Sequence, residues 1–202
     1  MDWREKIYYK TESILIKSDR IMLPDSAPTS IRVGNSDIPF ASHARNLGIT
    51  ISSNTTVDKH VTNICRSAYT ELRRISSIRH LLTVNATKTP LSVFVLSKLD
   101  YCNSLLCGSP QFILDKLQRV QNSAARLVMK SRKCAHVQPL LRSLHWLPDH
   151  SRIDYKISTL CFNTFTNSSA VYIAQLLSVY TPSRHLSSSS DRRTLHIPFV
   201  RD

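Results

Sequence analysis

Glycine is scarce in this sequence. It occurs three times, at positions 34, 48 and 108, whereas average usage of about 7% would place roughly fourteen in a chain of this length. Two glycine-rich phosphate-binding motifs, the dinucleotide-binding fingerprint and the Walker loop, are therefore absent from these 202 residues.

Clustered carboxylates and a catalytic constellation are also missing. The 14 acidic residues are scattered without an Asp-Asp or Asp-x-Asp pair, although transfer chemistry with two metal ions requires several carboxylates around shared ions. The eight histidines accompany no recognisable nucleophile motif. His145 stands beside Trp146 and Pro148, which is more typical of an aromatic anchor at a helix end. The sequence predicts no catalytic residue, no metal site and no cofactor.

Cysteine pairs and long apolar runs are lacking as well. The five cysteines include no CxxC motif, which favours reduced thiols in an intracellular protein, nuclear or cytoplasmic. The first ten residues contain no apolar signal segment, and the uncharged stretch 157–183 is polar in its middle. We therefore expect a protein that is not secreted and has no membrane partner.

Positive charge, in contrast, is abundant. The chain has 27 Lys and Arg against 14 Asp and Glu, a formal net charge of +13. Residues 59–133 hold thirteen of the basic residues and three of the acidic ones. Such an excess repels itself unless a polyanion relieves it, which points to nucleic acid or an acidic membrane surface.

Seven of these basic residues lie off the apolar stripes of two predicted helices. The alternative is that they form ordinary solvated helix faces, since Lys and Arg are mostly exposed. Because carboxylates are nearly absent nearby, contact with a phosphate backbone is the favoured interpretation, without sequence-specific readout. The predicted nucleic-acid-binding residues are Arg66, Arg73, Arg74, Lys116, Arg119, Arg126 and Lys130.

The N-terminal region, residues 1–53, has the pattern of a small β element. A short β-branched run covers residues 14–16, and residues 31–33 and 37–38 flank a turn signal typical of a hairpin. Leu47, Ile49 and Ile51 alternate with polar residues or glycine, which predicts a further strand.

Residues 54–180 have a helical period. Apolar positions recur every three or four residues over 57–82, and again over 113–128. Further helical patterns cover 91–99, 137–147, 153–165 and 170–177. The sequence thus predicts a mainly α fold, an antiparallel bundle of five or six helices preceded by a small β hairpin and strand element. Residues 181–202, rich in Ser and Arg, are expected to form a disordered or truncated tail.

Helix ends can also be predicted. Asn54, Thr55 or Thr56 is expected to cap the first helix, and Thr83 or Asn85 the second. Pro90 falls inside the second helical pattern, so that helix is expected to begin later or to kink there. Pro110 is expected at the entry of the third helix.

A series of ordered motifs carries a family resemblance. They are KTE at residues 10–12, ARNLGI at 44–49, DKHV at 58–61, SKLDYCNSLL at 97–106, LQRVQNSAARL at 117–127, LHWLP at 144–148 and RIDYKI at 152–157. This series closely resembles the C-terminal part of reverse transcriptases from non-LTR (LINE-type, jockey-like) retrotransposons. The resemblance spans residues 10–190, nearly the whole chain.

The resemblance implies specific roles. Lys10, Thr11 and Glu12 correspond to the motif just after the catalytic aspartates of the palm, and Asn46, Leu47 and Gly48 to the primer-grip region. The helices resemble the thumb, which holds the template–primer duplex. The resemblance further implies that the catalytic aspartates, and the Mg²⁺ they bind, belong to a palm that would precede this sequence.

The expected function is therefore a polymerase fragment that binds RNA or an RNA/DNA duplex, with no sequence preference and no small-molecule substrate, without copying it. The missing palm of a parent polymerase is a further expected partner. An inert degenerate remnant and a helical protein-interaction bundle with no nucleic-acid role are the alternatives.

Overall fold

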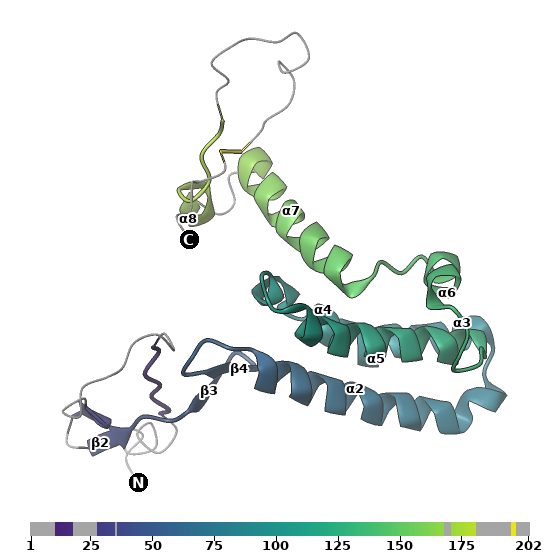
Figure 1. Cartoon of the computed structure of the whole chain (residues 1–202), viewed down its shortest axis with the longest axis horizontal. Helices are drawn as coiled ribbons and strands as arrows, with labels where there is room; N and C mark the ends of the chain where they lie inside the picture. The colour runs from purple at the N-terminus through teal and green to yellow at the C-terminus, as the bar shows by residue number, and fades with distance from the viewer. Residues whose placement is uncertain (1–10, 18–27, 35, 168–170, 181–194, 197–202) are drawn as a thin grey trace. The chain divides into compact units, whose positions relative to one another are not determined.

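The computed structural model describes residues 11–17, 28–34, 36–167, 171–180 and 195–196. Two small antiparallel strand pairs precede a series of helices, so the predicted mainly α fold is confirmed (Figure 1). The chain divides into two compact units, residues 1–153 and residues 154–202. Lys10 and most of the predicted tail 181–202 lie outside the described residues.

The β element consists of two hairpins. β1 (Ser30–Val33) pairs with β2 (Ser36–Pro39), and β3 (His43–Asn46) pairs with β4 (Ile49–Ser52). The first hairpin and a strand ending near Ile51 were predicted, whereas strand β3 was not, and two details of the prediction are wrong. Residues 14–16 belong to no strand, although Ser13 forms a bridge with Phe40. Leu47 lies in the turn of the second hairpin, not in a strand, and is 80% exposed.

The first long helix, α2 (Asp58–Ile78), follows the predicted apolar stripe. Val61, Ala68, Leu72 and Ile75 are buried on one side of it, as the 3.6-residue period requires. The predicted side-chain cap is wrong: Val57 holds the cap position and makes no side-chain bond. The Asn54 carboxamide oxygen instead accepts hydrogen bonds from Thr56, because Asn readily closes a local turn before a helix.

The chain then turns back through a short 3₁₀ segment η1 (Arg79–Leu81), α3 (Val84–Leu91), a π-helical segment η2 (Ser92–Leu96) and α4 (Ser97–Asp100). Thr83 caps α3 by accepting a hydrogen bond from the Ala86 amide, as predicted. The helix contains Pro90 and does not begin after it. Instead the π-helical turn follows directly, which is where a proline that removes a helical hydrogen bond is expected to alter the geometry.

After η3 (Asn103–Leu106), the chain enters α5 (Gln111–Met129) directly behind Pro110, as predicted. α6 (Val137–Leu144) ends at His145, which has a left-handed conformation, and Trp146 behind it is half-buried. α7 (Asp149–Asn167) starts earlier than its predicted apolar run, and α8 (Val171–Ala174) is a single turn.

The core of the first unit lies between α2, the α3–α4 return and α5, which contact one another. Its largest fully buried side chains include Leu91, Val95, Ile113 and Leu117. The α3–α4 return runs opposite to α2, and α5 runs opposite to this return, so α2 and α5 lie side by side and run in the same direction (Figure 1). This parallel pair positions the candidate site.

Candidate nucleic-acid interface

Contacts at both ends fix the alignment of α2 and α5. At their N-terminal ends, the Lys116 ammonium lies 3.4 Å from a carboxylate oxygen of Asp58. At their C-terminal ends, the buried Arg79 guanidinium donates hydrogen bonds to the main-chain oxygens of Leu127 (2.8 Å) and Val128 (2.6 Å). A cation against the last carbonyls of a helix opposes the negative end of its dipole. The two helices therefore present their outer faces over the same length.

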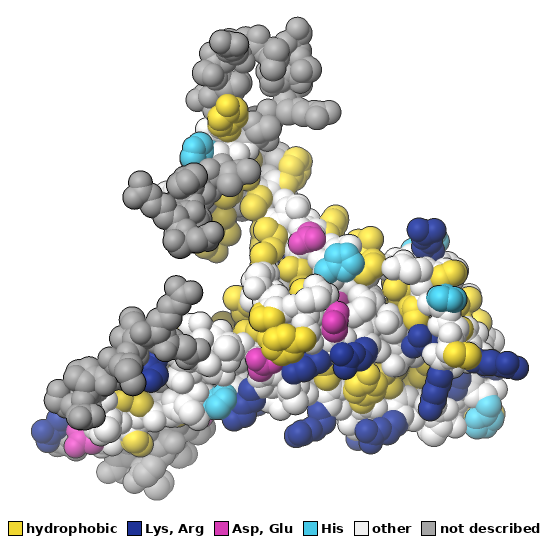
Figure 2. Space-filling model, viewed as in Figure 1, with side chains coloured by type: hydrophobic (Ala, Val, Ile, Leu, Met, Phe, Trp, Pro, Cys, Tyr) yellow, Lys and Arg dark blue, Asp and Glu magenta, His cyan; other side chains and the backbone are white. Residues whose placement is uncertain are grey.

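On α2, Arg66 and Arg73 are seven residues apart and both are exposed. Two helical turns separate them, so they share a stripe on the side opposite the buried residues. On α5, Arg119 is exposed in the same way. Basic side chains gather over α2 and α5 in the space-filling view (Figure 2). We call Arg66, Arg73, Arg74, Arg119 and Lys130 the basic face.

The basic face is nearly free of carboxylates. Within the described residues, Arg66, Arg73, Arg119 and Lys130 form no ion pair. Arg74 is exposed and lies 3.4 Å from Glu71, which also pairs with Lys98 at 3.7 Å. Because the Arg74 side of this pair is exposed to solvent, the pair contributes little to stability and leaves the guanidinium accessible to a phosphate.

Two of the seven predicted residues are committed to internal contacts. Lys116 is half-buried, pairs with Asp58 and lies over the Phe112 ring at 5.5 Å from its centre. Arg126 is half-buried and donates a hydrogen bond to the Ala135 oxygen at 3.2 Å. The sequence places both residues off the apolar stripe of α5, but their neighbours from other segments were not visible in it.

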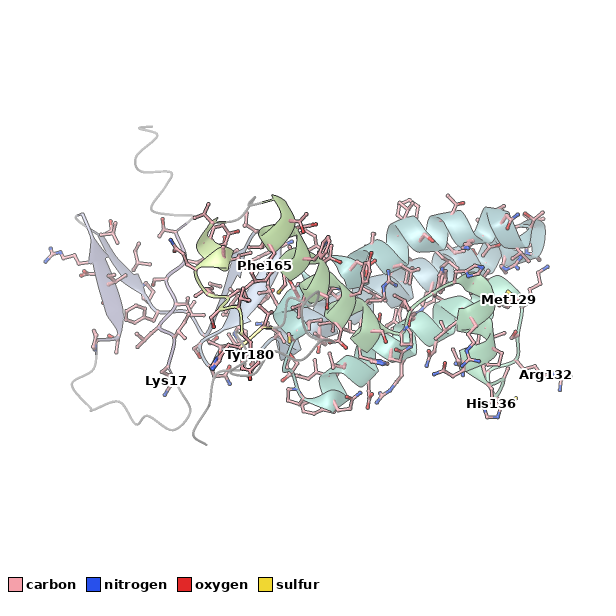
Figure 3. All side chains as sticks on the ribbon, turned by 90° about the horizontal axis from the view of Figure 1, so that it is seen from above. Lys17, Met129, Arg132, His136, Phe165 and Tyr180 are labelled. Carbon is pink, nitrogen blue, oxygen red and sulfur yellow. The ribbon has the colours of Figure 1, made fainter. Side chains whose placement is uncertain are left out.

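The end of α5 extends the positive surface. Lys130 ends the helix with a left-handed conformation (φ 52°) and is exposed. Arg132 and Lys133 in the following loop are exposed too. Figure 3 shows Arg132 and His136 pointing away from the helices beyond Met129.

The motifs that carry the resemblance come together in space around the second hairpin. Asn46 ends β3, and Leu47 and Gly48 form its turn with positive φ values of 47° and 82°. The Tyr101 hydroxyl donates a hydrogen bond to the Leu47 oxygen at 2.7 Å. A Glu12 carboxylate oxygen accepts one from the Arg45 amide at 3.0 Å. Thr11 is exposed next to it.

A pocket of about 610 Å³ lies between this hairpin, α2 and α4. Its basic lining residues are Arg45, Lys98 and His60, and the Lys98 ammonium donates a hydrogen bond to the Ser67 hydroxyl at 2.7 Å. Burial, and to a lesser extent the Arg45 charge, lowers the pKa of His60. Sequence reasoning missed this pocket, because its walls come from segments far apart in the chain.

Two further titratable groups lie near α5, the half-buried Cys65 and the buried Asp149. Burial raises the pKa of the Cys65 thiol on α2, while the charges of Lys116 and Arg119 act against that rise. Burial also raises the pKa of Asp149 to about 7, with Arg152 lowering it and Asp100 raising it further. One Asp149 carboxylate oxygen is buried with no hydrogen-bond partner in the described part of the chain.

The described residues contain no group of three or more His, Cys, Asp or Glu placed to hold a metal ion. None of the described helices is both long and apolar enough to span a bilayer. Comparison with models of protein families, with curated proteins and with solved structures gives no match.

Proposed function

We propose that this chain is a thumb-like part of a non-LTR retrotransposon RNA-directed DNA polymerase, which binds RNA or an RNA/DNA duplex through the basic face without copying it. The observation that carries the proposal is the basic face itself. Exposed cations stand on two parallel helices that are held in register, with almost no carboxylate among them. Backbone phosphates are the partners that such a surface suits.

The ordered motifs support the family part of this proposal. KTE and ARNLGI meet at the Glu12–Arg45 hydrogen bond, and ARNLGI meets SKLDYCNSLL at the Leu47–Tyr101 hydrogen bond. Motifs that resemble neighbouring blocks of one enzyme thus lie next to each other here. The 202 residues contain no paired aspartates, which is why binding without synthesis is proposed.

Salt dependence tests the binding. If all five cations of the basic face meet phosphates, the logarithm of the association constant on duplex DNA should fall with log salt at a slope of about −4.5. The measurement is fluorescence anisotropy of a labelled duplex over a range of KCl concentrations, repeated with an RNA/DNA duplex of the same sequence. A slope near zero contradicts the proposal.

A charge-matched pair of variants tests the location. The triple variant Arg66→Gln, Arg73→Gln, Arg119→Gln should reduce the steepness of the slope by about 3. The control triple Arg32→Gln, Arg142→Gln, Lys156→Gln removes three exposed cations outside the basic face and should leave most of the slope intact. Equal losses in both triples would show non-specific attraction by net charge. Primer extension with Mg²⁺ and a primed RNA should give no product.

A protein-interaction role is the second candidate, supported by exposed apolar side chains on the α3–η2 return. Val84, Val93 and Phe94 are 45%, 56% and 51% exposed. A palm domain of a parent polymerase is the partner proposed for this surface. Association that is insensitive to salt but lost in a Val93→Ser, Phe94→Ser variant would favour this role over nucleic-acid binding.

A further inference from the structure

The pocket between the second hairpin, α2 and α4 is separate from the basic face and has the size and lining of a ligand site. Its volume of about 610 Å³ lies within the range of small-molecule sites, about 300–1,000 Å³. Two cationic side chains line it, Arg45 from β3 and Lys98 from α4, and no carboxylate does. The positive lining favours an anionic ligand.

The pocket also offers an ordered aromatic ring. Tyr101 lines it and is 52% exposed, yet its hydroxyl is bonded to the Leu47 oxygen. Its ring lies 3.7 Å from where a side-chain carbon at Gly48 would stand. Because the ring is already held at its hydroxyl, stacking a ligand on it costs little side-chain entropy.

Uncharged polar groups complete the lining. Asn63 and Ser67 come from α2, Thr50 from β4 and Ser97 from α4. Amide and hydroxyl groups of this kind hydrogen-bond the edge of a base or a sugar hydroxyl. His60, buried in the wall, contributes no positive charge near neutral pH because burial and Arg45 lower its pKa. The anion-binding charges are thus that of Arg45, which forms no ion pair within the described residues, and that of Lys98, whose 3.7 Å pair with Glu71 a bound phosphate would displace.

We propose that this pocket binds a single nucleoside phosphate, with the phosphate between Arg45 and Lys98 and the base on the Tyr101 ring. The ligand is one nucleotide, either free or at the end of a single strand, and not the duplex proposed for the basic face. The two sites use different cations, since Arg66, Arg73 and Arg119 do not line the pocket.

Isothermal titration of the full chain tests the proposal with three probes: a nucleoside 5′-monophosphate, the matching nucleoside and inorganic phosphate. The monophosphate should bind at least tenfold more tightly than either of the others, because only it engages both the cations and the ring. Arg45→Gln removes an exposed cation and should weaken monophosphate binding about tenfold. Equal affinity for monophosphate and phosphate, or an unchanged affinity in Arg45→Gln, overturns the proposal.

A second variant separates this site from the basic face. Arg66→Gln should weaken duplex binding and leave monophosphate binding unchanged. Arg45→Gln should weaken monophosphate binding and leave duplex binding unchanged. Loss of monophosphate binding in Arg66→Gln to the same extent as in Arg45→Gln contradicts a separate pocket. A short single-stranded oligonucleotide with a terminal phosphate identifies the source: competition with the monophosphate indicates a strand end, and its absence indicates a free nucleotide.

Discussion

The Tyr101 hydroxyl donates a hydrogen bond to the main-chain oxygen of Leu47 at 2.7 Å, across 54 positions of the sequence. This contact joins the end of α4 to the turn of the second hairpin and forms one wall of the pocket. It also holds in place a turn in which Leu47 has a positive φ, a conformation that costs energy for a residue other than glycine.

Removing this hydroxyl should destabilise the first unit. Tyr101→Phe keeps the ring but leaves the Leu47 oxygen without this donor, so we expect a loss of about 1 kcal/mol in the free energy of unfolding. Urea titration followed by circular dichroism measures it. Tyr155→Phe, at a residue that is 66% exposed, is the matched control and should change stability by less than about 0.5 kcal/mol. An unchanged free energy of unfolding in Tyr101→Phe would contradict a structural role for this hydrogen bond.

Arg79 should be far more important for stability than for binding. Its guanidinium is buried and donates to three main-chain oxygens, those of Leu82, Leu127 and Val128. Arg79→Met leaves these acceptors without their charged donor, so we expect a loss of about 3 kcal/mol or more. Arg73→Met removes an exposed arginine and should have little effect on the thermal midpoint. Similar midpoints for both variants would contradict the buried role.

Asp149 should make stability fall as pH rises. Burial raises its pKa to about 7 in the folded chain, above the unfolded value of about 3.9. The folded state therefore binds more protons than the unfolded state between about pH 4 and 7. The contribution of Asp149 to the free energy of unfolding is therefore largest below about pH 4. It declines as the pH rises to 7, by about 4 kcal/mol at most.

Asp149→Asn isolates this effect. The neutral amide removes the titration, so the variant should show a flatter dependence of unfolding free energy on pH between 4 and 7 than the parent chain. Denaturant titrations at several pH values measure the two curves. Parallel curves would show that Asp149 does not carry the dependence.

Lys116 and Arg119 should behave differently although they are three residues apart. Lys116 is engaged by Asp58 and the Phe112 ring, whereas Arg119 has no ion-pair partner in the described residues. Arg119→Gln should reduce the steepness of the salt slope of duplex binding by about 1, and Lys116→Gln by clearly less. Identical slopes in the two variants would contradict the division of the seven cations drawn from the structure.

Much of the helical fold could be predicted because its signals are local. The stripe of Val61, Ala68, Leu72 and Ile75 repeats with the helical period whatever surrounds it, and a Thr83 side chain can reach the start of its own helix. The prediction failed where a side chain has two possible local partners, and where a contact from a distant segment fixes the backbone. Asn54 closes a local turn instead of capping α2, and Leu47 lies in a turn fixed by a distant tyrosine.

Local patterning by itself determined the mainly α architecture, the first hairpin, a strand ending near Ile51 and the concentration of positive charge on α2 and α5, because spacing and composition act within a few residues. Only the tertiary structure decided which cations remain exposed to solvent and which form hydrogen bonds or ion pairs inside the protein. Lys116 and Arg126 lie off the apolar stripe of α5, and Arg79 directly follows α2, yet each meets groups from another segment. Likewise the pocket exists only because Arg45, His60 and Lys98, from separate elements, meet when the chain folds.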